Sequence, residues 1–326
     1  MPETRKLRFG ILGTGNIAGQ FSAGVQAARR CALAAVGSRS IHSAEAFADR
    51  FAIPTRHGRY EDLFADPTID ALYVSAPNAL HRPLTLAALA AGKHVLCEKP
   101  LALNAAEAEE MFDAARRAGR LLVEAFMYLS HPQTLAVTAA VQRDRAVGNL
   151  SLIRSNFCYA TRKIEGNVRF SRGLGGGALM DVGCYCISLA RHLFQAEPDA
   201  VHASARFDDP SGVDVLTSVL LQFPGGRQSL FSCGMQTHGD NTAHLCGDAG
   251  WIEVPWPWKP APDRSGFTLA RGIPPRQDQA GSASTLGASQ SPPAPGGPAV
   301  ASGRQHVPVP VDGDLFGIEA DDFASA

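Results

Sequence analysis

The first 126 residues alternate short apolar runs with amphipathic stretches, and no other feature restricts the fold as strongly. The apolar runs span 7–12, 31–37, 69–75, 94–97 and 121–126. They are too short for helices and lack two-residue alternation, as expected of strands that are covered on both faces. Helical periodicity occupies 17–30, 43–51, 80–91 and 105–118. Strand and helix in succession predict an α/β fold, a doubly wound parallel (Rossmann) sheet over residues 1–126.

The pattern changes after about residue 150, where the apolar runs become longer and alternate in polarity. These runs span 150–159, 200–207, 213–223, 228–235 and 244–253. They predict a large, mostly antiparallel open sheet, with one embedded helix over 178–194 and a bridging helix over 131–145. We therefore expect a C-terminal α+β domain over 127–271.

The segment 272–312 has a different composition. Of its first 39 residues, 19 are Gly, Pro or Ser, and few are large and apolar. Such a segment buries too little surface to offset its ordering entropy, so it is predicted to be flexible. The chain then resumes over 313–326 with a helical pattern.

Charge and cysteine content narrow the class of protein. Thirty Lys and Arg against 31 Asp and Glu give a net charge of −1, which lacks the positive field of a nucleic-acid binder. No apolar run approaches the roughly 20 residues that cross a bilayer, and no export segment precedes the first strand. Seven scattered cysteines fit reduced thiols. We expect a cytoplasmic protein with no nucleic-acid or membrane partner.

A glycine motif, Gly13-Thr-Gly15-Asn16-Ile17-Ala18, follows the first strand and opens the first helix. In this context Gly13 permits the tight turn, Gly15 allows close backbone approach to a pyrophosphate, and the helix N-terminus faces the phosphates. Gly13, Gly15, Asn16 and Ile17 are therefore predicted to bind a dinucleotide. The alternative is a plain glycine turn without a ligand.

The end of the second strand discriminates between nicotinamide cofactors. An acidic residue there would bind the ribose 2′-hydroxyl of NAD, but the sequence has Ser38-Arg39-Ser40. A guanidinium beside hydroxyls suits a 2′-phosphate, so Ser38 and Arg39 predict NADP, with NAD the less favoured cofactor. Arg39 could instead be a solvated surface charge.

Two later strands also end in polar residues, at the sheet edge where ligands bind in this architecture. Residues of both ends are assigned to the cofactor site: Ser75, Pro77, Asn78, His81, Glu98 and Lys99. Asn78 could equally cap the helix that follows it. Lys99 precedes Pro100, which restricts it to extended geometry and so sets the direction of its ammonium group.

A glycine run at 175–177 precedes the predicted helix that carries Asp181 and Tyr185. These two residues are four positions apart and share one helix face, which makes them candidates for catalysis with Lys99. Asp181 could instead complement the helix dipole, and Tyr185 could be a core aromatic residue. No metal site is predicted, because Cys184 and Cys186 lack suitably spaced partners.

Taken together, these motifs resemble the glucose-fructose oxidoreductase / inositol dehydrogenase / rhizopine catabolism (Gfo/Idh/MocA) family over about residues 7–260. The matching segments are 13–18, 77–81, 91–100, 124–132 and 167–185. Glu124-Ala-Phe-Met and the tyrosine at 185 are most similar to the branch that contains trans-dihydrodiol dehydrogenases, D-xylose dehydrogenases and glucose-fructose oxidoreductase, which is typically NADP-dependent.

The resemblance implies an oxidoreductase that transfers a hydride between the nicotinamide and a carbinol carbon of a sugar, polyol or trans-dihydrodiol. It implies that Lys99 and Tyr185 handle the proton with help from Asp181. It also implies that the domain over 127–271 serves substrate binding and oligomerisation, with its open sheet forming a homo-oligomer. Lysine and tyrosine titrate near 10 in model peptides, so we expect Lys99 to lower the pKa of Tyr185. Relatives continue beyond the helix matched by 315–323, which predicts a shortened C-terminal helix. The alternative function is a non-catalytic dinucleotide-binding regulator or redox sensor.

Overall fold

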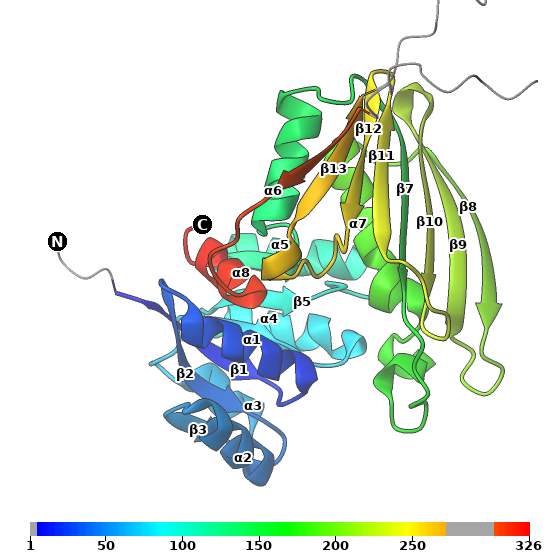
Figure 1. Ribbon diagram of the computed structural model, residues 1–326. Coiled ribbons are helices and arrows are strands. Elements are labelled where there is room, and N and C mark those ends of the chain that lie inside the picture. The colour runs from blue at the N-terminus through cyan, green and yellow to red at the C-terminus, as the bar shows by residue number, and fades with distance from the viewer. Residues whose placement is uncertain (1–4, 272–302) are drawn as a thin grey trace, which may run out of the picture.

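The first half of the chain forms the predicted parallel sheet, with strand order β3-β2-β1-β4-β5-β6 (Figure 1). The computed structural model describes residues 5–271 and 303–326. The strands are β1 Leu7–Leu12, β2 Cys31–Gly37, β3 Thr55–His57, β4 Ala71–Val74, β5 His94–Glu98 and β6 Leu122–Ala125. The helices between them are α1 Asn16–Ala27, α2 Ile41–Phe51, α3 Tyr60–Ala65, α4 His81–Ala90 and α5 Ala105–Ala118. The short elements β3 and α3 were not predicted.

Both faces of this sheet are covered, as its continuous apolar strands predicted. On one face, Phe9 and Ile11 of β1 pack in a buried cluster with residues of α1 and α2. On the other face, Leu12 and Leu72 pack with residues of α3, α4 and α5. Helices on both faces leave the carboxyl ends of the strands as the accessible edge, which is where ligands bind in this architecture.

The second half forms an eight-stranded sheet in the order β14-β13-β12-β11-β7-β10-β9-β8. Every neighbouring pair is antiparallel except β7 and β10, which are parallel. The strands are β7 Leu150–Cys158, β8 Ala200–Phe207, β9 Asp214–Phe223, β10 Arg227–Gly234, β11 Thr242–Gly247, β12 Gly250–Pro255, β13 Gly266–Arg271 and β14 Arg304–Pro308.

Two long helical stretches cover one face of the large sheet. The first is α6 Pro132–Thr138, which continues as a π-helical turn, Ala139–Arg143. The second begins with the π-helical turn Leu179–Gly183 and continues as α7 Cys184–Phe194. Alternate residues of β9, from Val215 to Phe223, are buried on the helix side, while the opposite face is more exposed. The described residues also include short 3-10 turns at Asn78–Leu80, Val168–Phe170, Arg172–Leu174, Pro224–Gly226 and Pro262–Arg264.

One stretch departs from the expectation that no apolar run approaches membrane-spanning length. Arg172–Phe194 has 23 residues, and an 18-residue window within it has a mean hydropathy of 1.3, so the stretch is long and apolar enough to cross a membrane by length and composition alone. In this fold its apolar stripe, including Val182, Cys186 and Leu189, is buried in the core between helix and sheet. The apolar side chains of this stretch therefore pack in the core of the second half.

The prediction of flexibility over 272–312 is wrong for its last part. Residues 272–302 lie outside the described residues, but 304–308 form β14, which pairs with β13. Val307 lies opposite Phe267 in that pairing and packs against the main core. A neighbouring strand supplies hydrogen bonds and apolar contact that composition alone did not reveal.

The last helix, α8 Leu315–Phe323, packs against α1 of the first sheet (Figure 1). Phe316, Ala320 and Phe323 are buried, and the Phe323 ring lies 5.6 Å from that of Phe9. The Asp321 carboxylate accepts backbone hydrogen bonds from Arg29 and Arg30 at 2.9 and 2.7 Å. Helix α8, which was predicted from the helical pattern near the end of the sequence, therefore adds to the layer that α1 forms on one face of the first sheet.

Candidate active site

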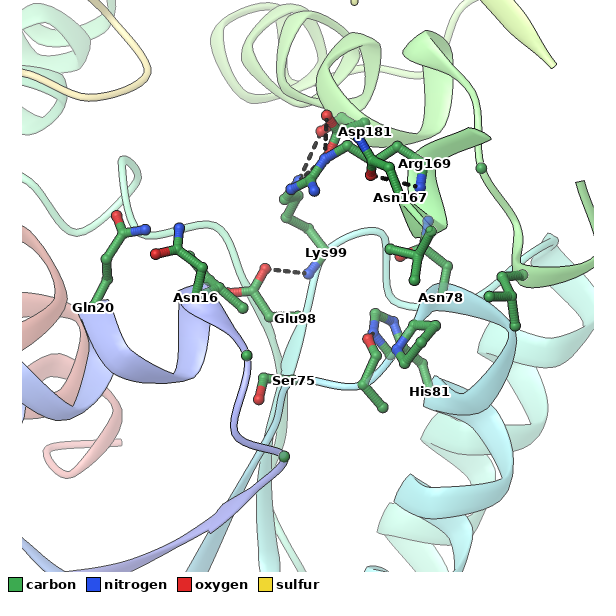
Figure 2. Close-up of a pocket in the computed structure, with 18 of the residues that line it drawn as sticks. Asn16, Gln20, Ser75, Asn78, His81, Glu98, Lys99, Asn167, Arg169 and Asp181 are labelled. Atoms are coloured by element: carbon green, nitrogen blue, oxygen red, sulfur yellow. Dashed lines mark hydrogen bonds and ion pairs between the residues drawn. The ribbon is translucent and has the colours of Figure 1, made fainter. Parts of the chain in front are cut away.

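A pocket of about 720 Å³ lies between the carboxyl edge of the parallel sheet and the loops of the second half. All fourteen residues proposed for the cofactor and for catalysis line it: Gly13, Gly15, Asn16, Ile17, Ser38, Arg39, Ser75, Pro77, Asn78, His81, Glu98, Lys99, Asp181 and Tyr185. Figure 2 shows the middle of this pocket, where Lys99 extends toward Asp181 and Asn16 lies beyond Glu98.

The glycine turn has the geometry that a dinucleotide requires. Gly13 has φ +102°, in the left-handed region that favours glycine, and its N–H donates to the carbonyl of Gly37 at 3.0 Å. Gly15 precedes α1, and a Cβ added there would meet no atom within 4 Å. No side chain caps α1, so its first N–H groups can bind phosphate oxygens. The residues present therefore fit the pyrophosphate of a dinucleotide.

The end of β2 carries no acidic side chain toward the pocket. Ser38 is buried, Arg39 is exposed at the rim, and Tyr60 lines the same end. Burial raises the pKa of Tyr60, although the positive charge of Arg39 opposes the rise. This end of the pocket presents a guanidinium group and hydroxyl groups, which fit a 2′-phosphate better than two ribose hydroxyls.

Asn78 and His81 connect parts of the pocket wall. The Asn78 Nδ2 donates to the carbonyl of Gly175 at 2.8 Å, so its side chain joins the two halves of the chain and does not cap a helix. The imidazole of His81 is buried, with Nδ1 2.8 Å from the carbonyl of Pro100 and Nε2 2.9 Å from that of Ala76. Burial lowers the pKa of His81. The neutral imidazole can donate a hydrogen bond to one of these two carbonyls, which belong to loops that line the pocket.

Lys99 and Asp181 meet although 82 positions separate them. The Nζ of Lys99 donates to the backbone carbonyl of Asp181 at 2.7 Å and lies 3.6 Å from its Oδ1. Burial, the largest single effect, disfavours the ammonium, but the charges of Asp181, Cys184 and Glu98 together outweigh it and raise the pKa of Lys99. Lys99 is therefore a charged donor held at the end of β5.

Two residues that the sequence did not single out as site residues also hold Asp181. The hydroxyl of Tyr159 donates to Oδ2 at 2.6 Å, and the Nε of Arg169 lies 2.9 Å from the same oxygen. Burial would raise the pKa of Asp181, but Lys99, Arg169 and Tyr159 together hold it below its usual value. Arg169 lies within a quoted family motif, whereas Tyr159 follows a strand and carries no local signal.

Tyr185 lies beside Lys99 but in a strongly apolar setting. Its ring centroid is 5.0 Å from the Nζ of Lys99, and its hydroxyl donates to the Sδ of Met127 at 3.3 Å. The aromatic rings of Phe126, Tyr128, Phe157 and Trp258 surround it. Burial, and then the charge of Glu98, raise the pKa of Tyr185 well above its usual value.

The expected lowering of the Tyr185 pKa by Lys99 is therefore wrong for this structure. The ammonium lies over the ring and is bound to Asp181, while the hydroxyl faces a thioether. A phenol that neither solvent nor a cation stabilises as phenolate stays protonated at neutral pH. The raised pKa therefore favours the protonated phenol of Tyr185 in this structure.

Glu98 is a buried carboxyl group beneath Lys99. It accepts hydrogen bonds from the hydroxyl of Tyr73 and, at 3.2 Å, from the backbone N–H of Lys99. Burial raises the pKa of Glu98, with the charge of Lys99 opposing the rise. These bonds fix the backbone that carries the lysine.

Sixteen further residues, from helices, strands and loops of both halves of the chain, also line the pocket. They are Thr14, Gln20, Tyr60, Ala76, Met127, Phe157, Tyr159, Thr161, Asn167, Val168, Arg169, Leu174, Gly176, Gly177, Val182 and Lys259. Within residues 5–271 and 303–326, no cluster of His, Cys, Asp and Glu could hold a metal ion. The pocket therefore combines a dinucleotide end with an end built from a lysine, a carboxylate and a phenol.

Comparison with known proteins covers most of the chain. Residues 7–126 match the GFO/IDH/MocA model, described as "Oxidoreductase family, NAD-binding Rossmann fold", and residues 136–253 match the GFO/IDH/MocA C-terminal domain. The chain is 35% identical to trans-1,2-dihydrobenzene-1,2-diol dehydrogenase of Mus musculus, over 78% of this chain and 76% of the relative. It is 40% identical to D-xylose 1-dehydrogenase (NADP(+)) 2 of Haloferax volcanii, over 71% and 70%.

A solved structure has the same fold over nearly the whole chain. The 3-ketoreductase from Actinomadura kijaniata, in complex with NADP and TDP-benzene, has a TM-score of 0.81 and 27% identity. The match covers 99% of this chain and 90% of that protein.

Proposed function

The chain belongs to the Gfo/Idh/MocA family of oxidoreductases, and on that premise we propose that it transfers a hydride between NADP(H) and a carbinol carbon of a sugar, polyol or trans-dihydrodiol. One observation carries the proposal: a single pocket joins the glycine turn to Lys99, Asp181 and Tyr185. Relatives named as a dihydrodiol dehydrogenase and an NADP(+)-dependent xylose dehydrogenase support the substrate classes.

NADP is the cofactor of this proposal. Gly13, Gly15 and the N-terminus of α1 hold its pyrophosphate, while Ser38 and Arg39 hold the 2′-phosphate. When bound, the nicotinamide supplies or accepts the hydride. The remaining catalytic tasks are positioning the substrate oxygen and moving one proton.

Lys99 and Tyr185 divide those tasks. In the direction of carbonyl reduction, the ammonium of Lys99 donates a hydrogen bond to the substrate oxygen and stabilises the negative charge that develops there. The protonated phenol of Tyr185 delivers the proton to that oxygen. Asp181 keeps Lys99 charged and directed into the pocket. In the oxidising direction the reverse path needs Tyr185 as a phenolate, which must first lose its own proton and then takes the proton of the substrate hydroxyl.

Replacing the two proposed catalytic groups tests the mechanism. We expect Lys99→Met and Tyr185→Phe each to lower kcat by about 100-fold or more, because each removes a group that acts on the substrate oxygen in the transition state. Titration of the variants with NADP+ is expected to give dissociation constants close to that of the parent protein.

Matched variants control for the loss of a charge or a buried hydroxyl. Lys163→Met removes an exposed lysine outside the pocket, and Tyr128→Phe removes a buried hydroxyl that bonds Ser188. Both controls are expected to retain turnover. Full turnover in Lys99→Met or Tyr185→Phe would contradict the role assigned to that residue. NADP+ binding without turnover on aldoses, polyols and trans-dihydrodiols would favour a regulatory protein.

The proposed setting is the cytoplasm, with the protein assembled as a homo-oligomer. In the described part of the chain all seven cysteines are free thiols, as a reducing compartment would keep them. The helix-free face of the large sheet is the surface through which copies of the chain would associate.

A further inference from the structure

The end of the pocket that contains Lys99, Asp181 and Tyr185 is called the catalytic end below. Lys99, Arg169 and Lys259 are the basic side chains that line it. The acidic side chains in the lining of this pocket are Asp181 and Glu98. Asp181 pairs with both Lys99 and Arg169, and Glu98 is a buried carboxyl bonded to Tyr73. This end of the pocket therefore has more basic side chains than carboxylates that could neutralise their charge.

Lys259 is held at the pocket wall by its neighbour in the chain. Trp258 is buried, its indole N–H donates to the carbonyl of Asn156 at 2.9 Å, and its ring stacks on Phe157 at 5.8 Å between centroids. Lys259 is exposed and lines the pocket, and it forms no ion pair within 4 Å among residues 5–271 and 303–326. Partial burial and the positive charge of Lys99 lower its pKa.

Arg169 also has unused donors. Its Nε lies beside Asp181, while its Nη groups make no hydrogen bond to the described residues. About half of its side chain is exposed, on the wall formed by the 3-10 turn Val168–Phe170. Arginine donors that converge with a lysine on one cavity are the usual recognition chemistry for carboxylates and phosphates.

We infer that Lys259 and Arg169 bind an anionic group, a carboxylate or a phosphate, on the substrate, which is therefore an acidic sugar derivative. This inference rests on the proposed function, because it names the substrate class of the same site. The anionic group would be held away from the reacting carbon, which lies at Lys99 and Tyr185.

The phosphates of the cofactor do not account for these cations. The proposed pyrophosphate and 2′-phosphate sites belong to the first sheet, at Gly15 and Arg39. Lys259 belongs to the loop between β12 and β13, and the charges that act on it are those of the catalytic end, from Lys99, Glu98, Asp181 and Arg169. Its position thus matches the substrate and not the nucleotide.

Binding of matched sugars to the NADP+-loaded protein tests this inference. D-glucose is the neutral probe, D-glucuronate presents a carboxylate and D-glucose 6-phosphate presents a phosphate. Calorimetric titration at low salt is expected to show tighter binding of at least one anionic probe than of glucose, by about tenfold or more, because hydrogen bonds to charged groups are strong. The relative affinities of the two anionic probes distinguish a carboxylate from a phosphate.

Removing the charge of Lys259 makes the test specific. We expect Lys259→Gln to abolish most of the preference for the anionic probe, with the affinities for glucose and NADP+ unchanged. Lys163→Gln, which removes an exposed lysine outside the pocket, is expected to leave the preference intact.

Several outcomes would overturn the inference. They are equal binding of all three probes, absence of binding by both anions, a preference that survives Lys259→Gln, and a loss of NADP+ affinity in that variant. Turnover of neutral substrates in any of these cases would leave the proposed function standing. Absence of turnover with every substrate, neutral or acidic, would count against the proposed function itself.

Discussion

Asp181 shows how one carboxylate organises the catalytic end of the pocket. It is bonded to Lys99, Arg169 and Tyr159, and these partners keep it ionised in spite of its burial. Its own charge in turn raises the pKa of Lys99. The two groups therefore stabilise each other's charged forms, and the lysine remains a cation over a wide range of pH.

Asp181→Asn is expected to lower kcat by about 10- to 100-fold and to move the alkaline limb of the pH profile to lower pH. Lys99 is charged below its pKa, and Asp181 raises that pKa. Without that carboxylate, burial meets less opposition and the pKa of Lys99 falls, so the ammonium is lost at lower pH. The measurement is kcat as a function of pH.

Tyr159→Phe is the control for this pH shift, because it removes a bond to Asp181 but retains the carboxylate. Its alkaline limb is expected to coincide with that of the parent protein. An unmoved limb in Asp181→Asn would mean that another group sets the alkaline limit.

Arg39 is the residue that we propose determines the choice of cofactor. Arg39→Ala is expected to weaken NADP+ binding by about 10- to 100-fold while NAD+ binding changes little, because only NADP has a phosphate at this position. Comparison of KM for the two cofactors provides the measurement. Arg59→Ala removes an exposed arginine outside the pocket and should leave the ratio unchanged. A constant ratio in Arg39→Ala would refute the assignment.

Two helices from opposite ends of the chain, α1 and α8, approach each other at a pair of glycines. A Cβ on Gly24 would lie 2.6 Å from the backbone nitrogen of Gly317 and 2.7 Å from the Cβ of Phe316. A Cβ on Gly317 would lie 2.7 Å from the carbonyl oxygen of Gly24. Contact of backbone with backbone cannot relax by a change of rotamer.

Gly24→Ala is therefore expected to destabilise the protein by about 1–3 kcal/mol, although alanine favours a helix by about 1 kcal/mol over glycine. Gly19→Ala in the same helix is the matched control, since its Cβ would first meet the ring edge of Phe51 at 3.4 Å. Denaturant unfolding is expected to show a neutral or stabilising effect at Gly19. Equal effects at the two sites would mean that α8 does not pack closely on α1.

At the level of the whole molecule, the two sheets differ in how they are covered. The first sheet has helices on both faces, while the second has α6 and α7 on one face (Figure 1). The other face of the second sheet presents Leu230, which is 41% exposed and lies opposite Leu220 and Arg154 on the neighbouring strands. An open, partly apolar sheet face of this kind suits association between copies of the chain.

Leu230→Glu is expected to convert the proposed homo-oligomer to a smaller species, because a buried interface disfavours an unpaired charge. Sedimentation velocity provides the measurement. Leu135→Glu introduces the same charge on α6, where the leucine is 54% exposed, and should leave the assembly unchanged. An oligomer that is insensitive to Leu230→Glu would place the interface elsewhere.

The alternation of the longer strands and helices, the glycine turn and the polar strand ends could be predicted from the sequence, whereas the short elements β3 and α3 could not. Periodicity and turn chemistry are local properties, and parallel strands bring their carboxyl ends to one edge. That is why Gly13, Ser75 and Lys99 could be expected to share a site. The strand at 304–308 could not be predicted, because its stability depends on pairing with β13.

Only the tertiary structure determined the electrostatics of that site. The neighbours of Tyr185 come from four segments of the chain, and they bury its hydroxyl against Met127 and leave Lys99 over the ring. Tyr159 and Arg169 reach the pocket from the connection between β7 and α7, and Lys259 reaches it from the loop between β12 and β13. A pKa depends on burial and on distances through space, and neither can be read from spacing along the chain.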